Sequence, residues 1–250
     1  MNEHRVAIGY CHAGTLCQPF VKSLLNMSYY DHAHEQHIGR IIDVGSTYVA
    51  DARNIVVRKF LESDSTWLLF FDHDMVFAEN IVSQFVELAE KNPDKLVIGG
   101  LYFNYLDDGK LWSTWMEPVG KIVFATVTSW EASDFKELSA CGMGGTLIHR
   151  SVFERIQKSH SEDSWPWYAH DLVDIGQNKM ERLGEDITFC WRAKQESIKI
   201  WGYTGITLGH IKPHMEDLKT FAQQPWVHYS GAAEHNRSLG CSGYSGYRQT

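Results

Sequence analysis

The chain has 250 residues, of which 44% are hydrophobic and 22% are charged, the balance of a globular domain with a sizeable core. A net charge of −8 argues against a basic nucleic-acid surface over the whole chain, and no apolar run reaches the length of about 18 residues that a membrane span needs. Five scattered cysteines without a C-x-x-C pair argue against a disulfide framework and a cysteine zinc site. Because the first residues lack a signal-peptide layout, we expect a cytoplasmic protein.

The first half of the chain alternates between strand and helix patterns. Short apolar runs predict strands, and apolar residues at helical spacing predict helices. Strands that alternate with helices predict an α/β domain with a mostly parallel sheet flanked by helices. The predicted strands are residues 5–10, 38–44, 67–71 and 96–101, and the predicted helices are residues 16–27, 47–61 and 79–91.

The pattern changes in the second half. Aromatic and β-branched residues between turn signals predict hairpin-like strands over residues 111–138, and Ser151 with Glu154 forms a capping box that predicts a helix start. A polar and aromatic stretch at residues 161–177 predicts a loop over a site. The remaining predicted elements are a strand at residues 144–149, a helix at residues 185–196 and one or two strands within residues 198–210.

Periodicity is lost near Lys212. We therefore expect one domain over residues 1–211 and a C-terminal tail over residues 212–250. The tail is interpreted as a lid over the active site, and its Gly-, Ser- and Tyr-rich end as a mobile segment.

Asp72 and Asp74 follow the apolar run at residues 67–71 with one residue between them. They are expected at the carboxyl end of a strand, where open α/β sheets bind ligands. Carboxylates suit Mg²⁺ or Mn²⁺, and such an ion can bridge diphosphate oxygens. A solvated acidic turn is the alternative, because about one such match is expected by chance.

Glu185 and Asp186 follow Gly184 at the predicted start of a helix. A carboxylate in the first turn is often only a partner of the helix dipole or a cap. The functional alternative is a general base that takes a proton from an attacking hydroxyl. Successive helical residues point about 100° apart, so we expect only one of the two to face a site. We favour Asp186, with Glu185 near the acceptor or the helix cap.

His210 ends the last predicted strand. It can complete a metal shell with the two aspartates, or it can be an ordinary hydrogen-bonded histidine. His214 and His228 are weaker candidates. Residues 31–37 (DHAHEQH) contain several metal-ligand residue types, but we place them in a polar loop without a catalytic role.

Arg53, within an Ala-Arg-Asn segment at residues 52–54, can reach a diphosphate or lie on a solvated helix face. Gly144 and Gly145 follow Cys141 in a glycine-rich segment that allows close approach to a ligand, or forms a bulge or tight turn. The aromatic residues 165–168, which include Trp167, can stack on a sugar or a base, or can form a packed loop.

These features occur in the order found in one family. The chain resembles glycosyltransferases of the GT-A type, especially those of family 2, from about Val6 to Ile211. The resemblance is carried by the segments 41–46 (IIDVGS), 52–54 (ARN), 72–74 (DHD), 144–150 (GGTLIHR), 184–186 (GED) and 191–193 (WRA), together with His210.

The resemblance implies a GT-A fold and a metal-dependent glycosyltransferase that moves a sugar from a nucleotide-diphosphate donor, expected to be a UDP-sugar, to an acceptor hydroxyl. It also implies a single inverting displacement with Asp186 as the base. Asp74 and His210 are then ligands of Mn²⁺ or Mg²⁺, with Asp72 on ribose or metal. The other expected substrate-binding residues are Tyr10, Asp43, Arg53, Gly144, Gly145 and Trp167, with Asp43 at the nucleotide base.

The family pattern leaves the acceptor open. The short chain also resembles small stand-alone transferases of bacteriophages, so the candidates are a glycan, a protein side chain and a hydroxylated DNA base, although the acidic balance disfavours DNA. The first alternative function is a sugar nucleotidyltransferase, but no Gly-rich loop with a basic cluster follows the first strand. The second is a GT-A-like domain that binds a glycan or nucleotide without turnover, against which the intact Asp74 and Asp186 argue.

Overall fold

The structure is a computed structural model that describes residues 5–105, 111–118, 124–174 and 180–211, all within one compact unit. The predicted tail at residues 212–250, with His214 and His228, lies outside the described residues. The elements are β1 (Val6–His12), α1 (Gln18–His34), β2 (Ile38–Gly45), α2 (Val49–Leu61), β3 (Trp67–Asp72), β4 (Met75–Val76), α3 (Ile81–Lys91), β5 (Val97–Leu101), β6 (Phe103–Tyr105), β7 (Leu111–Ser113), β8 (Trp115–Pro118), β9 (Phe124–Thr126), β10 (Phe135–Leu138), β11 (Ala140–Cys141), β12 (Gly145–His149), α4 (Arg150–Ser159), β13 (Leu172–Asp174), β14 (Met180–Arg182), α5 (Glu185–Gln195), β15 (Ile200–Thr207) and β16 (Gly209–His210).

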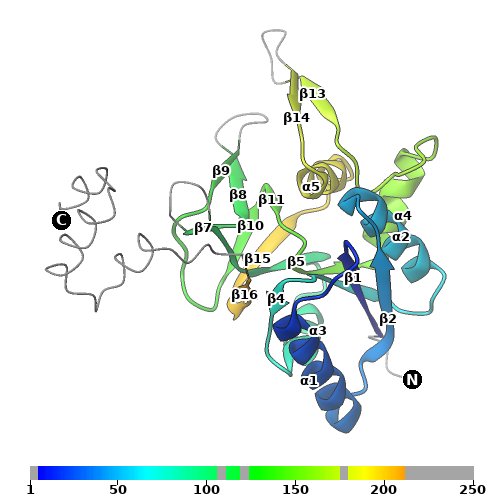
Figure 1. Ribbon diagram of the computed structural model, residues 1–250. Coiled ribbons are helices and arrows are strands. Elements are labelled where there is room, and N and C mark those ends of the chain that lie inside the picture. The colour runs from blue at the N-terminus through cyan, green and yellow to red at the C-terminus, as the bar shows by residue number, and fades with distance from the viewer. Residues whose placement is uncertain (1–4, 106–110, 119–123, 175–179, 212–250) are drawn as a thin grey trace, which may run out of the picture. The chain divides into compact units, whose positions relative to one another are not determined.

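A seven-stranded sheet has the order β10-β15-β5-β12-β3-β1-β2. Figure 1 shows β15 and β5 toward one side of this sheet and β1 and β2 toward the other. β1 runs parallel to β2 and β3, and β15 runs parallel to β5. β12 lies antiparallel between β3 and β5, and β10 lies antiparallel to β15 at the edge. β1, β2, β3, β5 and β15 therefore run the same way, which confirms the predicted mostly parallel sheet.

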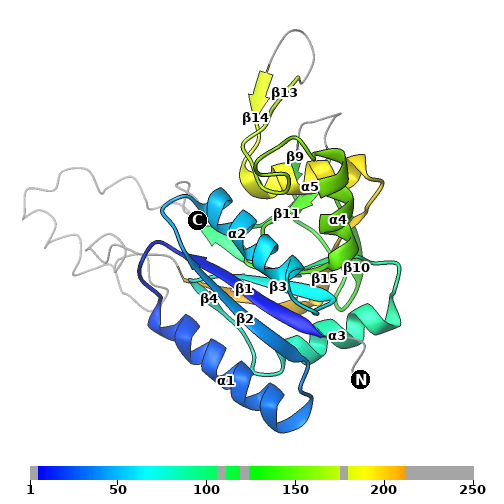
Figure 2. The ribbon, with the colours of Figure 1, turned by 90° about the vertical axis from the view of Figure 1, so that its right-hand side faces the viewer.

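Helices cover both faces of this sheet. Side chains alternate between the faces of a strand. In β3, Leu68 and Phe70 pack in one core with residues of α2, α4 and α5, whereas Leu69 and Phe71 pack in a second core with residues of α1 and α3. Figure 2 shows α1 and α2 on opposite sides of the sheet. Burial on both faces explains why residues 67–71 form a continuous apolar run.

The end of α1 corrects the interpretation of residues 31–37. Residues 31–34 belong to the last turn of α1 and not to a loop. Asp31 is buried, and its carboxylate accepts the backbone N–H groups of His37 and Ile38, each at 3.0 Å. An acidic side chain thus joins the end of the helix to the start of β2, a contact that the helical spacing of apolar residues does not reveal.

The start of α4 corrects the predicted capping box. The helix begins at Arg150, and His149 is its N-cap, with Nδ1 accepting the N–H of Ser151 at 3.3 Å. Ser151 therefore lies inside the first turn. Because β12 ends at His149, the strand continues into the helix without an intervening loop.

The remaining predicted elements agree with the structure to within a few residues at their ends. In the predicted loop at residues 161–177, residues 161–171 contain no helix or strand, β13 follows, and residues 175–177 lie outside the described residues. Among the described helices, none combines the length and the apolar character that crossing a membrane requires.

Candidate active site

The carboxyl ends of β1, β2 and β3 lie side by side. Tyr10 pairs with Asp43 across β1 and β2, and Cys11 pairs with Asp72 across β1 and β3. Parallel pairing therefore brings Asp43 and Asp72 to one edge of the sheet, where open α/β folds bind ligands.

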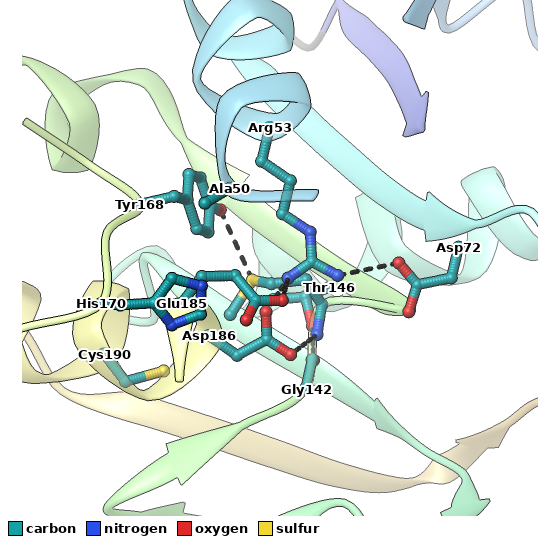
Figure 3. Close-up of polar contacts among 12 residues, drawn as sticks. Ala50, Arg53, Asp72, Gly142, Thr146, Tyr168, His170, Glu185, Asp186 and Cys190 are labelled. Carbon is teal, nitrogen blue, oxygen red and sulfur yellow. Dashed lines mark hydrogen bonds and ion pairs between the residues drawn. The ribbon is translucent and has the colours of Figure 1, made fainter. Parts of the chain in front are cut away.

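Arg53 connects three motifs that lie far apart in the sequence (Figure 3). This α2 side chain is 3% exposed, and its Nη2 lies 2.8 Å from Oδ1 of Asp72. Its Nη1 lies 3.0 Å from Oε1 of Glu185 and also contacts Oδ1 of Asp186. The fork of a guanidinium suits such contacts with several carboxylates.

This cluster holds more negative than positive charge. Burial lowers the pKa of Arg53, but the carboxylates of Asp72 and Glu185 raise it, so that it lies above the ordinary value for arginine. Arg53 is therefore a fixed cation. Its single charge leaves the three carboxylates with an excess of negative charge, which favours a cationic ligand nearby.

Glu185 and Asp186 both reach this cluster, which corrects the expectation that only one would face the site. Both lie in the first turn of α5, after the N-cap Gly184. Although their Cα–Cβ bonds diverge by about 100°, the longer Glu185 side chain bends back to Nη1 of Arg53. Asp186 also accepts the N–H of Met143 through Oδ2, at 3.4 Å. The helix position alone therefore does not decide between the two carboxylates.

Gly144 packs against groups of the protein itself. Its N–H donates to Oη of Tyr102 at 2.9 Å. A Cβ atom on Gly144 would lie 3.0 Å from both Oδ2 of Asp72 and Oη of Tyr102, and one on Gly145 would lie 2.7 Å from Cδ2 of Leu208. Burial raises the pKa of Tyr102 well above its usual value, and the charge of Asp72 raises it further. Glycine at position 144 thus lets Asp72 and Tyr102 approach the chain closely.

Asp74 and His210 form a second polar pair beside this cluster. β16 pairs with β4, and Nε2 of His210 lies 3.2 Å from Oδ2 of Asp74. Nδ1 of His210 lies 2.9 Å from the carbonyl oxygen of Phe103. Because a carbonyl only accepts, Nδ1 carries a proton, and the Nε2 lone pair of a neutral His210 faces a carboxylate oxygen.

Of the three predicted metal ligands, Asp74 and His210 therefore form a pair, and Asp72 lies apart from them, bound to Arg53. Among the described residues, no group of three or more His, Cys, Asp and Glu side chains is placed to hold a metal ion. Asp74 and His210 face each other, whereas one oxygen of Asp72 is bound to Arg53. A histidine whose Nδ1–H is held by a backbone carbonyl has the orientation typical of a metal ligand, so the donor set of the pair fits a divalent cation.

Asp43 is about half exposed at the end of β2, and its Oδ1 lies 3.0 Å from Nε2 of His12. Nδ1 of His12 accepts the N–H of Gly14 at 2.9 Å, so Nε2 carries the proton that is donated to Asp43. Tyr10 is buried, and its ring packs edge-on against Phe20 at 5.2 Å. Burial raises the pKa of Tyr10, and the charge of Asp43 raises it further.

Trp167 lies in the core, where its indole N–H donates to the carbonyl of Phe153 at 2.9 Å and only 1% of the residue is exposed. Trp167 is therefore a packing residue, in line with the alternative that residues 165–168 form a packed loop. Arg192, of the Trp-Arg-Ala segment, binds both carboxylate oxygens of Asp171 and the carbonyls of Trp165 and Pro166. These contacts of Arg192 hold the loop at residues 165–171 in place.

Two further side chains lie beside Arg53, namely Tyr168 from the aromatic segment 165–168 and Asn54 from the segment 52–54. Tyr168 stacks on Phe189 at 5.0 Å, and the guanidinium of Arg53 lies 5.8 Å from the Tyr168 ring. The fully buried Asn54 donates to the carbonyl of Tyr168 at 2.6 Å and accepts its N–H at 3.2 Å. In the sequence, the position of Asn54 next to Arg53 is the signal for this role. One residue of the pair reaches the cluster, and its neighbour in the helix holds the backbone of Tyr168.

Comparisons with known proteins identify the family and the fold. The profile of glycosyl transferase family 2 matches residues 31–157, about half of the chain. Among solved structures, A197 from STIV is 23% identical, with a TM-score of 0.53 over 84% of this chain and 86% of that chain. GalNAc-T7 with UDP, GalNAc and Mn²⁺ is 12% identical, with a TM-score of 0.54 over 96% of this chain and 55% of that chain. No curated protein sequence matches significantly. At these identities the structures show the fold alone, and they confirm the predicted fold class.

Proposed function

The chain belongs to glycosyl transferase family 2 and is a glycosyltransferase with the GT-A fold, and we propose that it moves a sugar from a UDP-sugar to an acceptor hydroxyl at the acidic cluster around Arg53. One observation supports this placement above the others. Three motifs meet at the guanidinium group of Arg53, since Asp72 lies 19 positions after it and Glu185, followed by Asp186, lies 132 positions after it. Contacts of this kind position reacting groups at a site.

The donor diphosphate is proposed to bind with a divalent cation at Asp74 and His210, with Asp72 on ribose or metal. Nε2 of His210 lies 3.2 Å from Oδ2 of Asp74, and these two atoms would hold the cation. When bound, Mn²⁺ or Mg²⁺ supplies charge that stabilises the leaving nucleotide. Arg53 adds a fixed positive charge next to Asp72.

Asp43 is proposed to contact the nucleotide base. Its Oδ1 accepts the Nε2–H of His12, and the side chain is still about half exposed. His12 thereby holds Asp43 in place at the end of β2. Because Oδ2 is an acceptor, this arrangement favours a base that presents an N–H group, as uracil does at N3.

Asp186 is the proposed base. It takes the proton of the acceptor hydroxyl while that oxygen attacks the anomeric carbon and the bond between this carbon and the UDP oxygen breaks. One displacement of this kind inverts the anomeric centre. The N–H of Met143 and the guanidinium of Arg53 hold the carboxylate in position.

The test is titration calorimetry with UDP in Mn²⁺ and again in EDTA, followed by an assay of UDP release from UDP-hexoses. We expect binding only with Mn²⁺, and slow release of UDP without an acceptor. Absence of UDP binding in both conditions would remove UDP as the donor nucleotide. Release of pyrophosphate from UTP and a sugar phosphate would instead favour a nucleotidyltransferase.

A further inference from the structure

A second concave site lies where β10 pairs with β15, and the proposed chemistry uses none of its residues. It is a cavity of about 330 Å³ whose lining includes Trp130, Glu131, Asp134, Lys136 and Thr204. Ligand pockets span about 300–1,000 Å³. The volume is at the lower end of this range, which suits a ligand as small as a sugar ring better than a complete nucleotide sugar.

The cavity lies close to the Asp74–His210 pair. β10 runs antiparallel to β15, with Phe135 opposite Tyr203, so β10 starts toward the carboxyl end of β15. The ring of Trp130 lies 6.1 Å from the ring of Phe103 between centroids. The carbonyl of Phe103 is the acceptor for Nδ1 of His210. Phe103 thus contacts both Trp130 of the cavity lining and His210 of the proposed metal pair.

Trp130 presents an aromatic surface at this cavity. Its ring contacts Phe103 and, edge-on at 6.3 Å, Trp115, whereas 37% of the residue is exposed. Two aromatic neighbours therefore hold a ring that remains open to solvent. An indole offers a flat apolar face on which the C–H face of a sugar can pack.

Thr204 fixes the backbone of the cavity. Its Oγ1 donates to the carbonyl of Glu131 at 2.7 Å and accepts the N–H of Asp134 at 2.9 Å, and its own N–H donates to the carbonyl of Asp134 at 3.1 Å. Ser133 between them has a φ of 54°, in the left-handed region. A turn clamped in this way loses little conformational freedom when a ligand binds.

Two carboxylates that line the same cavity can accept hydrogen bonds from the hydroxyl groups of a ligand. Within the part of the chain that the structure describes, the Glu131 carboxylate makes no hydrogen bond or ion pair. Oδ1 of Asp134 accepts the N–H of Phe135 at 2.7 Å, which leaves its other oxygen for a ligand. Lys136 is paired with Glu117 at 3.2 Å, so its charge is already balanced. Acceptors beside an open aromatic ring suit an uncharged polyhydroxyl ligand.

We propose that this cavity binds a sugar ring of the acceptor, stacked on Trp130, with its hydroxyl groups donating to Glu131 and Asp134. The inference rests on the proposed function and specifies its acceptor as a glycan. A glycan bound here extends from the cavity past Phe103 to the proposed metal pair.

The first experiment measures binding of methyl glycosides of glucose, galactose, mannose and N-acetylglucosamine by saturation-transfer NMR. At least one should bind the wild-type chain, and Trp130→Ala should weaken it about tenfold or more. Tyr29→Ala is the matched control, because Tyr29 is an exposed aromatic residue on α1. Binding of no methyl glycoside, or equal binding to Trp130→Ala, would overturn the inference.

The second experiment separates this inference from the proposed function. Binding of UDP with Mn²⁺ should stay within about twofold in Trp130→Ala and in Glu131→Gln, because neither residue lies in the donor site. Loss of UDP binding in these variants would show that the cavity belongs to the donor site, against the inference. Failure of the wild-type chain to bind UDP would count against the proposed function alone. Trp130→Phe keeps an aromatic ring and should retain most glycoside binding, which distinguishes stacking from a loss of folding.

Discussion

Oδ2 of Asp74 lies 3.2 Å from Nε2 of His210, while Nδ1 of the same ring is held by the carbonyl of Phe103 at 2.9 Å. The carbonyl fixes the proton on Nδ1, so the carboxylate and a neutral imidazole present lone pairs to each other. The pair would offer one carboxylate oxygen and one imidazole nitrogen to a divalent cation, although its residues lie 136 positions apart.

His210→Ala should weaken the Mn²⁺-dependent binding of UDP by about tenfold or more, because the variant removes the proposed nitrogen ligand. Asp74→Asn should act in the same direction. Titration calorimetry at several Mn²⁺ concentrations measures the effect. His32→Ala, an exposed histidine on α1, is the control and should match the wild-type chain. If His210→Ala binds UDP with unchanged dependence on Mn²⁺, the pair does not hold the metal.

Asp186→Asn should keep UDP binding and reduce sugar transfer by about 100-fold or more, because proton transfer to a positioned base contributes about 10²–10⁴-fold. Glu185→Gln is the matched control, since its carboxylate contacts the same atom of Arg53. It should retain most of the activity. Steady-state assays with the best acceptor compare the two variants. Transfer that survives in Asp186→Asn and disappears in Glu185→Gln would assign the base to Glu185.

Arg53→Met should lower the free energy of unfolding, by at most about 3–5 kcal/mol, because it leaves three partly buried carboxylates without their cation. Arg53→Lys should recover part of this loss, since an ammonium keeps the charge but lacks the fork that reaches both Asp72 and Glu185. Chemical denaturation measures both variants. Lys59→Met, which removes a cation from the last turn of the same helix, is the control. Equal stability of Arg53→Met and wild type would mean that solvent already screens the cluster.

The sequence predicts the elements of this fold well where burial controls the pattern. Residues 67–71 are apolar because both faces of β3 are covered, and Asp72 is polar because the strand ends there. Local periodicity fails where a single polar contact decides an element's end. Asp31 joins the end of α1 to the start of β2 and His149 caps the start of α4, and neither contact leaves an apolar signature.

The contacts of the site were harder to predict than its members. Asp72, Glu185 and Asp186 stood out by their spacing, but their common partner Arg53 depends on how α5 packs beside α2. The aromatic residue expected to bind substrate is also not the exposed one. Trp167 is buried by core packing, whereas the open ring of Trp130 depends on a clamp by Thr204, a residue more than 70 positions away.

The free energy of unfolding should decrease as the pH rises above about 9, partly because of Cys11. Burial is the main reason why the pKa of this thiol is raised to about 12. The positive charge of Arg53 lowers this pKa, and the negative charge of Asp72 raises it. Between the ordinary value of 9.0 and about 12 the unfolded chain loses this proton and the folded chain keeps it, so ionisation favours unfolding. One such group contributes a slope of at most about 1.4 kcal/mol per pH unit.

Denaturant unfolding between about pH 8 and pH 10.5 measures this slope, and Cys11→Ala should make it shallower because the variant removes one titrating group. Cys17→Ala, which removes a less buried thiol, is the control and should keep the wild-type slope. Tyr10 acts in the same direction at higher pH, since burial and the charge of Asp43 raise its pKa as well. Identical slopes for the wild-type chain and Cys11→Ala would mean that the thiol ionises as readily in the folded chain as in the unfolded one, and that the edge formed by β1 and β3 admits more water than its burial indicates.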